Sequence, residues 1–526
     1  MAVGRLAVLA AVAVCLGTGS ALAGAAEPPP LRFEGFDTTT AYPGLACEVR
    51  PVIWDGRWPQ ACELVSQTGG VAPDPVRRLL VWTPETEGQA ATFEVRASDA
   101  SGTSETRRGR VACTRSGFYF VDQGAGADDG PGTEARPWKT IAKAAATLKA
   151  GETVLVRAGR YVEPEGPHGK GNWAMPTLTP QHSGEPGRPI TFRAYPGETV
   201  VVDSTIGTSG GRNYIVWEGF VLPYGAVAKM FGTEGSVLRG IYLHGHTAAT
   251  RDNHDGIRIQ HARRFMVQDC HIRNMRGLSW NSAGIKVYKE CTGVVEHCNL
   301  SGSHVNVFDK DSSRGIDYRR NVFDRGNFLG NNQGVAQGLR IYENLFLRCG
   351  INLHCYTADA HIWNNTLYGG GISGHHAARA AGVRCWNNIF WGIDTGFRPE
   401  VCDHNVYFHP DAEPFAKGPP FRLFRYLEHE ERYASLQAWR EATGLDAHSL
   451  AADPGFVDAA GGDFRLKPGS PALAAGKDGR HVGALATDGP PLGVRRPWRD
   501  RGPIPEEEAK TEAAMRLLDE ARKTRP

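Results

Sequence analysis

A short pattern of apolar and polar positions recurs between residues 265 and 407. It consists of an apolar residue, two mostly polar residues, an asparagine, any residue and another apolar residue, as in Tyr318–Phe323 and Ile341–Phe346. The asparagine position is occupied in turn by Cys270, Cys298, Asn321, Asn344, Asn365, Asn388 and Asn405. The steps between them are 28, 23, 23, 21, 23 and 17 residues. A period in this range, built from short apolar segments, predicts a solenoid.

A second pattern lies between these copies, as in Gly256–Ile259 and Gly284–Val287. Each period therefore holds at least two short strands whose side chains alternate inward and outward, with glycine or asparagine at the corners. The leucine consensus and helical segment of leucine-rich repeats are absent. Asparagines at one corner can hydrogen-bond to the same corner of the next rung and form a ladder. We therefore predict an all-β fold, a right-handed parallel β-helix.

The segments before and after the repeats differ in pattern. Residues 30–114 show strand-like runs separated by turns, such as Leu79–Pro84 and Ala91–Ala97, and predict a β-sandwich that resembles the immunoglobulin-like modules of secreted bacterial proteins. We assign residues 118–485 to the solenoid, with a helix near Ile141–Leu148 covering its open end. Residues 486–526 form a polar tail in which Pro505–Lys523 predicts a short charged helix.

Composition and charge narrow the functional class. The chain has 526 residues, of which 41% are hydrophobic and 22% charged, as in an ordinary folded protein. A net charge of +2 gives no sign of a nucleic-acid partner. Residues 1–23 combine a basic start, an apolar run and a small-residue cleavage site, which predicts a secretory signal peptide. We expect a monomer without a transmembrane segment that is secreted, periplasmic or held at the cell surface.

Ten cysteines remain after the expected removal of Cys15 with the signal peptide. Cys270 and Cys298 occupy the same position in successive copies of the repeat, and so do Cys385 and Cys402. A rung spacing of about 4.8 Å permits a disulfide between them. Stacking of free cysteines as small apolar residues is the equal alternative.

Both ends of the predicted solenoid resemble one family. The run Pro131–Ile141, followed by Gly151–Val154, resembles the entrance of pectate-lyase-like β-helix proteins. Asp453–Phe456, Gly462–Leu466 and Pro468–Ala472 resemble the final segment of secreted bacterial members of that superfamily. The resemblance covers roughly residues 118–485 and implies the fold more specifically than the activity, since one solenoid supports many chemistries.

The best candidates for chemistry are outward residues of the middle strands. Alternation directs Arg258 and Lys286 to the outer face of neighbouring rungs and Asn306 to the rung after them. Two stacked cations repel each other, which lowers the lysine pKa and suits it to act as a base. Asp252 and Asp255 precede the first of these strands. Asp309, Lys310, Asp311 and Arg314 follow the third, so the strip is expected to form a groove of cations and carboxylates.

Two lyase groups of this fold give the strip a function by resemblance. In the scheme of family-nine pectate lyases, Lys286 would be the base, and Asp252 and Asp255 would hold Ca²⁺. In the scheme of chondroitinase B and the alginate lyases, Lys286 would act with Arg258 or Arg314. The alternative is structural: outward lysines and arginines keep a sheet soluble, and an aspartate before glycine forms a turn.

Three aromatic residues predict a second surface. Tyr342, Trp363 and Trp386 each follow an inward residue of the repeat, so we expect them to share an outward face as a stacked stripe. Aromatic rings of this kind bind sugars by stacking, or they lie beneath a loop.

Three hypotheses follow for function. The first is a secreted polysaccharide lyase that cleaves an acidic, uronate-containing polysaccharide by β-elimination with Lys286 as base. The second is a glycoside hydrolase of the same fold that uses paired carboxylates, Asp255 with Asp309 or Asp311. The third is a surface protein that binds glycans through the aromatic stripe without catalysis.

Overall fold

The computed structural model describes most of the chain. The described residues are 29–57, 60–75, 77–163, 176–249, 253–279, 281–311, 313–330, 336–354, 357–375, 382–392, 395–396, 399–409, 421–425, 429–433, 435–490, 492–493 and 504–523. The expected signal peptide (residues 1–23) and Asp252 lie outside them. Among the described residues, no helix has the length and apolarity needed to cross a membrane.

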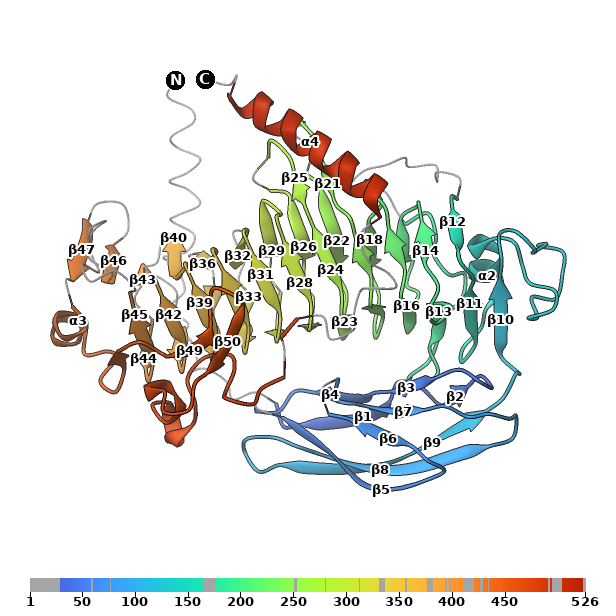
Figure 1. Cartoon of the computed structure of the whole chain (residues 1–526), viewed down its shortest axis with the longest axis horizontal. Helices are drawn as coiled ribbons and strands as arrows, with labels where there is room; N and C mark the ends of the chain where they lie inside the picture. Colours follow the sequence, from blue (N-terminus) through green and yellow to red (C-terminus); the bar gives the residue numbers. More distant parts are fainter. Residues whose placement is uncertain are drawn as a thin grey trace, which may run out of the picture.

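Three long sheets of parallel strands form the solenoid, and each complete rung gives one strand to each sheet (Figure 1). The first sheet contains β10 (Phe118–Val121), β11 (Thr153–Val156), β13 (Ile190–Ala194), β16 (Ile215–Glu218), β19 (Val237–Arg239), β23 (Phe265–Gln268), β27 (Gly293–Glu296), β30 (Ile316–Arg319), β34 (Arg340–Tyr342), β38 (His361–Trp363), β41 (Arg384–Trp386) and β44 (Val401–Asp403). The second contains β12 (Gly159–Tyr161), β14 (Val200–Val202), β17 (Val221–Leu222), β20 (Tyr242–Leu243), β24 (His271–Arg273), β28 (Asn299–Ser301), β31 (Val322–Asp324), β35 (Leu345–Leu347), β39 (Thr366–Tyr368), β42 (Ile389–Trp391), β45 (Val406–Phe408) and β48 (Leu450–Ala451).

The third sheet contains β15 (Ile206–Thr208), β18 (Ala228–Phe231), β22 (Asp255–Gln260), β26 (Ala283–Tyr288), β29 (Val305–Lys310), β32 (Asn327–Gly330), β36 (Ile351–His354), β40 (Ile372–His375), β43 (Thr395–Gly396), β46 (Phe421–Arg425) and β47 (His429–Tyr433). Its last pair, β46 and β47, is antiparallel. Short pairs lie at the corners and after the solenoid: β21 (His246–Thr247) with β25 (Met275–Arg276), β33 (Ala336–Gln337) with β37 (Thr357–Ala358), and β49 (Phe456–Asp458) with β50 (Asp463–Leu466). The predicted parallel β-helix is confirmed.

The predicted asparagine ladder forms the corner between the first and second sheets. Asn321 Nδ2 lies 3.0 Å from Asn344 Oδ1, and the same bond joins Asn344 to Asn365 and Asn365 to Asn388. All four side chains are completely buried. The residue before each asparagine or cysteine position has a left-handed φ, as at Arg320 (56°). The ladder therefore satisfies buried polar groups at a corner that the backbone turns sharply.

The cysteines of the repeat are free and buried. Cys385 and Cys402 pair in register on β41 and β44, and Cys270 and Cys298 are both fully buried. Of the two alternatives, the structure contains the stacked free cysteines. The other alternative, a disulfide in either pair, is wrong.

Two helices cover the ends of the solenoid, and the first of them was predicted. α2 (Ile141–Thr147) buries Ile141 and Ala144, and Thr140 caps it by accepting a hydrogen bond from the backbone of Lys143. α3 (Leu436–Thr443) packs Leu436 and Trp439 against the last rungs. Both helices shield the open ends of a stack that would otherwise expose apolar side chains.

The C-terminal helix α4 (Pro505–Lys523) lies across one edge of the solenoid, close to β21 and β25 (Figure 1). Glu507 is completely buried, where its carboxylate pairs with Arg160 and accepts the backbone N–H of Tyr224. Glu508 pairs with Arg273 at 2.8 Å and with His244 at 3.1 Å. The charged first turn of this helix therefore fixes it to the solenoid.

The N-terminal strands form small sheets around a separate core that includes Phe33, Trp82 and Phe93. One sheet contains β2 (Thr40–Ala41), β9 (Ser104–Cys113), β8 (Ala90–Ser98) and β5 (Ala61–Thr68). The others contain β3 (Cys47–Val49), β7 (Leu79–Trp82) and β6 (Ala72–Asp74), and β1 (Arg32–Phe36) with β4 (Pro51–Trp54). The packed sheets fit a β-sandwich, and its immunoglobulin-like character stays a prediction.

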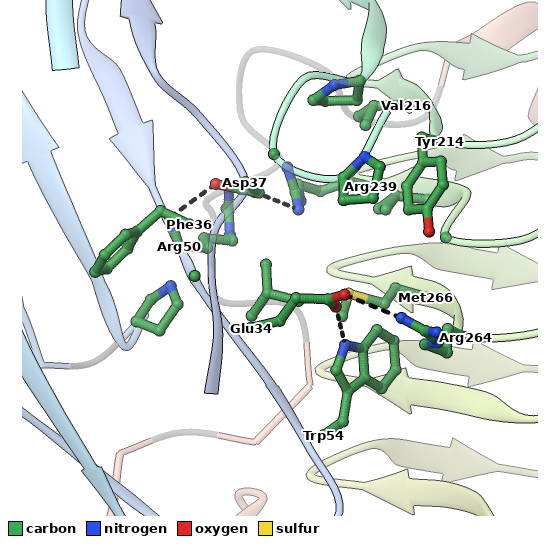
Figure 2. Close-up of a pocket in the computed structure, with 18 of the residues that line it drawn as sticks. Glu34, Phe36, Asp37, Arg50, Trp54, Tyr214, Val216, Arg239, Arg264 and Met266 are labelled. Atoms are coloured by element: carbon green, nitrogen blue, oxygen red, sulfur yellow. Dashed lines mark hydrogen bonds and ion pairs between the residues drawn. The ribbon is translucent and has the colours of Figure 1, made fainter. Parts of the chain in front are cut away.

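This N-terminal module lies along the first sheet of the solenoid (Figure 1). Ion pairs join the two parts: Asp37 lies 2.8 Å from Arg239, and Glu34 lies 2.9 Å from Arg264. A pocket of about 190 Å³ remains between them, lined by residues that include Trp54 and Tyr214 (Figure 2). Glu34 also accepts a hydrogen bond from the Trp54 indole at 2.7 Å.

Candidate functional site

Three cations share one column on the third sheet. Arg258 of β22 pairs in register with Lys286 of β26, which confirms the predicted neighbourhood of these two residues. Lys229 of β18 pairs with Arg258 from the other side, and the sequence analysis did not identify it. Since adjacent rungs lie about 4.8 Å apart, a guanidinium stands between two amines on consecutive strands.

A single carboxylate holds two members of this column. Lys286 Nζ lies 2.8 Å from Asp255 Oδ1, and Arg258 Nη1 lies 3.2 Å from Asp255 Oδ2. All three residues are no more than 3% exposed. The expected open groove is therefore wrong for this structure: the column is closed to solvent, and its charges interact in a medium of low polarity.

Burial shifts the pKa values of the lysines. Burial first and the nearby Arg258 second lower the pKa of Lys229 to about 8, against the opposing effect of Asp255. Burial also lowers the pKa of Lys286, whereas its pairing with Asp255 opposes the shift. Loss of a proton from these amines is therefore easier than from an exposed lysine, which is what a general base or acid near neutral pH requires.

Lys310 belongs to the same cluster. Its Nζ lies 5.3 Å from the ring centre of Phe308 and 5.7 Å from that of Tyr288. Phe308 follows Lys286 in the column, and Tyr288 pairs in register with Lys310. Burial and then the charge of Lys286 lower the pKa of Lys310. The structure therefore brings Lys310 to the column, as the sequence predicted.

The prediction for Asn306 is wrong. Lys286 pairs with Phe308, and Asn306 is completely buried, with its amide donating to the backbone carbonyl of Gly326 at 2.8 Å. The expected pairing of β29 with β26 was wrong by two residues, because Val307 and not Val305 pairs with Ile285. A slip of two residues preserves the alternation and cannot be detected from the pattern.

Two further predicted residues lie apart from the column. Arg314 is exposed and forms a backbone bridge with Gln337 at the corner after β29. Asp309 is completely buried and accepts a hydrogen bond from Tyr318 at 3.0 Å, and burial raises its pKa to about 6. Asp309 therefore does not converge with Asp255, as a pair of hydrolase carboxylates would.

Asp255 was also a predicted calcium ligand. Each of its oxygens already lies beside a cation, Lys286 or Arg258, and repulsion between cations disfavours a metal ion at the same carboxylate. Its predicted partner Asp252 lies outside the described residues. The described residues of the column thus do not fit a calcium site, and calcium binding stays a prediction.

The aromatic stripe forms as predicted on the first sheet. The ring centres of Tyr342 and Trp363 lie 5.1 Å apart, those of Trp363 and Trp386 lie 5.3 Å apart, and the rings are parallel within 6°. Tyr342 is buried and donates a hydrogen bond to Asp317 at 2.6 Å. Trp386 is only half-buried. Contact with a sugar therefore stays a prediction, for which Trp386 is the accessible member.

The pocket beside the N-terminal module is a separate feature. Its solenoid residues, such as Tyr214 and Arg239, belong to the first sheet or the corners next to it (Figure 2). The cation column lies on the third sheet. The pocket and the column are therefore two different places, and only the column combines lysines of lowered pKa with an arginine.

Comparison with known proteins agrees with this architecture. Residues 119–338 match the family model described as the Pel9A-like right-handed β-helix region. YwoF, an uncharacterized protein of Bacillus subtilis, is 25% identical over 68% of this chain and 92% of its own length.

Two solved structures are similar at low identity. The pectate lyase Pel9A is 15% identical, with a TM-score of 0.33 over 72% of this chain and 95% of that one. The family 28 exopolygalacturonase of Yersinia enterocolitica is 12% identical, with a TM-score of 0.39 over 76% of this chain and 85% of that one. The matched family model and the three parallel sheets agree that the chain contains a right-handed parallel β-helix similar to the Pel9A-like region.

Proposed function

We propose that this chain is a carbohydrate-active enzyme that cleaves an acidic, uronate-containing polysaccharide by β-elimination outside the cytoplasm. The observation that carries the proposal is the column Lys229–Arg258–Lys286, in which an arginine stands in register between two buried lysines. The match to the Pel9A-like region is consistent with it.

Each member of the column has one role in this reaction. Arg258 neutralises the uronate carboxylate, which makes the neighbouring proton more acidic. Lys286, in its neutral form, removes that proton from the carbon beside the carboxylate. The electron pair forms a carbon–carbon double bond, and the bond to the leaving oxygen breaks. Lys229, whose pKa is about 8, is mostly protonated at pH 7 and donates a proton to that oxygen.

Asp255 positions the base. Its carboxylate faces both Lys286 and Arg258, so it fixes the amine and the guanidinium relative to each other. Because the column is almost fully buried, a polymer reaches it only when the chain over the column moves aside. The same burial gives the lysines their lowered pKa values.

The test is a product assay on a panel of polysaccharides: pectate, alginate, chondroitin sulfate and dermatan sulfate. The full chain is incubated with each, with added calcium and with a chelator. We expect ultraviolet absorbance from the unsaturated uronate product on at least one substrate. New reducing ends without that absorbance would contradict β-elimination and favour a hydrolase. Loss of activity with chelator would assign a role to calcium.

A second candidate function is glycan binding by the aromatic stripe, which the half-buried Trp386 supports. We expect Trp386→Ala to weaken binding of an oligosaccharide several-fold in calorimetric titration while leaving the fold intact. Equal affinity in the variant would remove the stripe from consideration.

A further inference from the structure

A second cluster of chemically reactive side chains lies at the far end of the solenoid from the cation column. Asp403 ends β44, His404 follows it, and His448 comes from the segment between α3 and β48. Asp403 Oδ2 lies 2.7 Å from His448 Nδ1 and 3.9 Å from His404 Nε2. One ligand atom from each residue can be chosen so that all three lie within 4.8 Å of one another.

Backbone contacts fix the orientation of the carboxylate. Asp403 Oδ1 accepts the backbone N–H groups of His404, at 2.8 Å, and of His448, at 2.7 Å. With Oδ1 used in this way, Oδ2 faces the two imidazoles. The rings of His404 and His448 stand 4.9 Å apart and are parallel within 12°.

A second contact fixes His404. Its Nδ1 lies 3.2 Å from the backbone carbonyl of Ala475, which can accept a hydrogen bond but not donate one. In the neutral form of His404 the proton is therefore on Nδ1, and Nε2, which faces Asp403, carries the lone pair. A histidine that donates one ring N–H to a carbonyl and directs its other nitrogen to a shared point is the usual arrangement of a metal ligand.

The simpler explanation of this cluster is a hydrogen bond between Asp403 and His448 that stabilises a turn. That bond accounts for His448, but it does not account for His404, whose Nε2 faces the same carboxylate oxygen. Two imidazole nitrogens and one carboxylate oxygen are a donor set suited to Zn²⁺ and related transition-metal ions. The cluster is partly exposed, so water can complete the coordination.

We propose that Asp403, His404 and His448 bind one divalent transition-metal ion, such as Zn²⁺. The ligands come from β44 and from the segment after α3, and Ala475 holds His404 from a third segment. Binding joins these three parts of the C-terminal end, so the ion has a structural role. Because it binds the folded chain, it raises the melting temperature.

The test uses untagged full-length protein, first treated with chelator and then titrated with Zn²⁺ by calorimetry. We expect one ion per chain and a higher melting temperature with Zn²⁺ than without it. His404→Ala and His448→Ala should each weaken binding by more than about tenfold. The His448 side chain is 67% exposed, so its removal leaves the core intact.

The matched control is His182→Ala, which removes an exposed histidine elsewhere in the chain. Titration with Co²⁺ adds a readout independent of stability, because coordination by the imidazoles changes its visible spectrum. Absence of stoichiometric binding would overturn the proposal. Binding that His404→Ala and His448→Ala leave unchanged, or that His182→Ala weakens equally, would also overturn it.

Discussion

Lys286 Nζ lies 2.8 Å from Asp255 Oδ1, and neither side chain is more than 3% exposed. The same carboxylate reaches Arg258 on its own strand. A buried charge is tolerated when a partner compensates it, so Asp255 is the residue that keeps two cations in a column closed to solvent.

Removal of this carboxylate should be costly. Asp255→Asn preserves the size of the side chain but leaves Lys286 and Arg258 without their shared anion. We expect a loss of about 3–5 kcal/mol in the free energy of unfolding, measured with urea. Asp129→Asn, at an exposed position, is the control and should change stability by less than about 0.5 kcal/mol. Equal stability of the two variants would show that Asp255 does not compensate the positive charges of Lys286 and Arg258.

Lys229 should make stability depend on pH. Its pKa is about 8 in the folded chain and 10.5 in an ordinary environment, so the unfolded chain binds more protons between these values. The contribution of Lys229 to the free energy of unfolding therefore rises with pH across that window. Below pH 8 the charged amine destabilises the fold by about 3 kcal/mol.

Lys229→Met lacks this dependence. The free energy of unfolding of the wild type, minus that of Lys229→Met, should increase as the pH rises from 8 to 10.5. Urea unfolding at three pH values measures it. A difference independent of pH would contradict the lowered pKa.

The asparagine ladder should contribute strongly to stability. Asn365→Ala removes the bond to Asn388 and the oxygen that accepts the backbone N–H of Asn344, both inside the solenoid. We expect a loss of about 2–4 kcal/mol, because buried groups are left unpaired. Asn327→Ala changes an exposed asparagine on β32 and should cost less than about 1.5 kcal/mol. Similar costs for both would mean that the ladder is not specially important.

The contact between the N-terminal module and the solenoid depends on a buried pair. Asp37→Ala leaves Arg239, which is 3% exposed, without its 2.8 Å partner. We expect the module to unfold at a lower temperature than the solenoid in scanning calorimetry, as a separate transition. Glu63→Ala, in an exposed pair with Arg96, is the control. A single transition at the wild-type temperature in Asp37→Ala would contradict this role.

The sequence predicted the repeat well because the same physical constraint acts at every rung. A ladder asparagine must occupy one corner, so its recurrence revealed the β-helix, the stacked stripe and the neighbourhood of Arg258 and Lys286. Asn306 was misplaced because a slip of two residues leaves the alternation unchanged. Lys229 was missed because Ala228–Phe231 lacks the glycine–isoleucine pattern of the next two strands.

The burial of the column could not be predicted from the sequence. Outward residues of a strand are exposed or covered according to segments that are distant in sequence. Likewise, Asp255 looked like a turn residue or a metal ligand, and only the position of its oxygens between Lys286 and Arg258 showed the ion pairs.

The most direct test of the central claim is the initial rate of unsaturated uronate formation by wild type, Lys286→Met and Lys229→Met on the substrate that responds in the panel. Arg314→Met, at an exposed corner apart from the column, is the control. The account predicts that both lysine variants lose at least about 100-fold in rate and that the control keeps the wild-type rate. Full activity in Lys286→Met would contradict the assignment of the base and, with it, the catalytic role of the column.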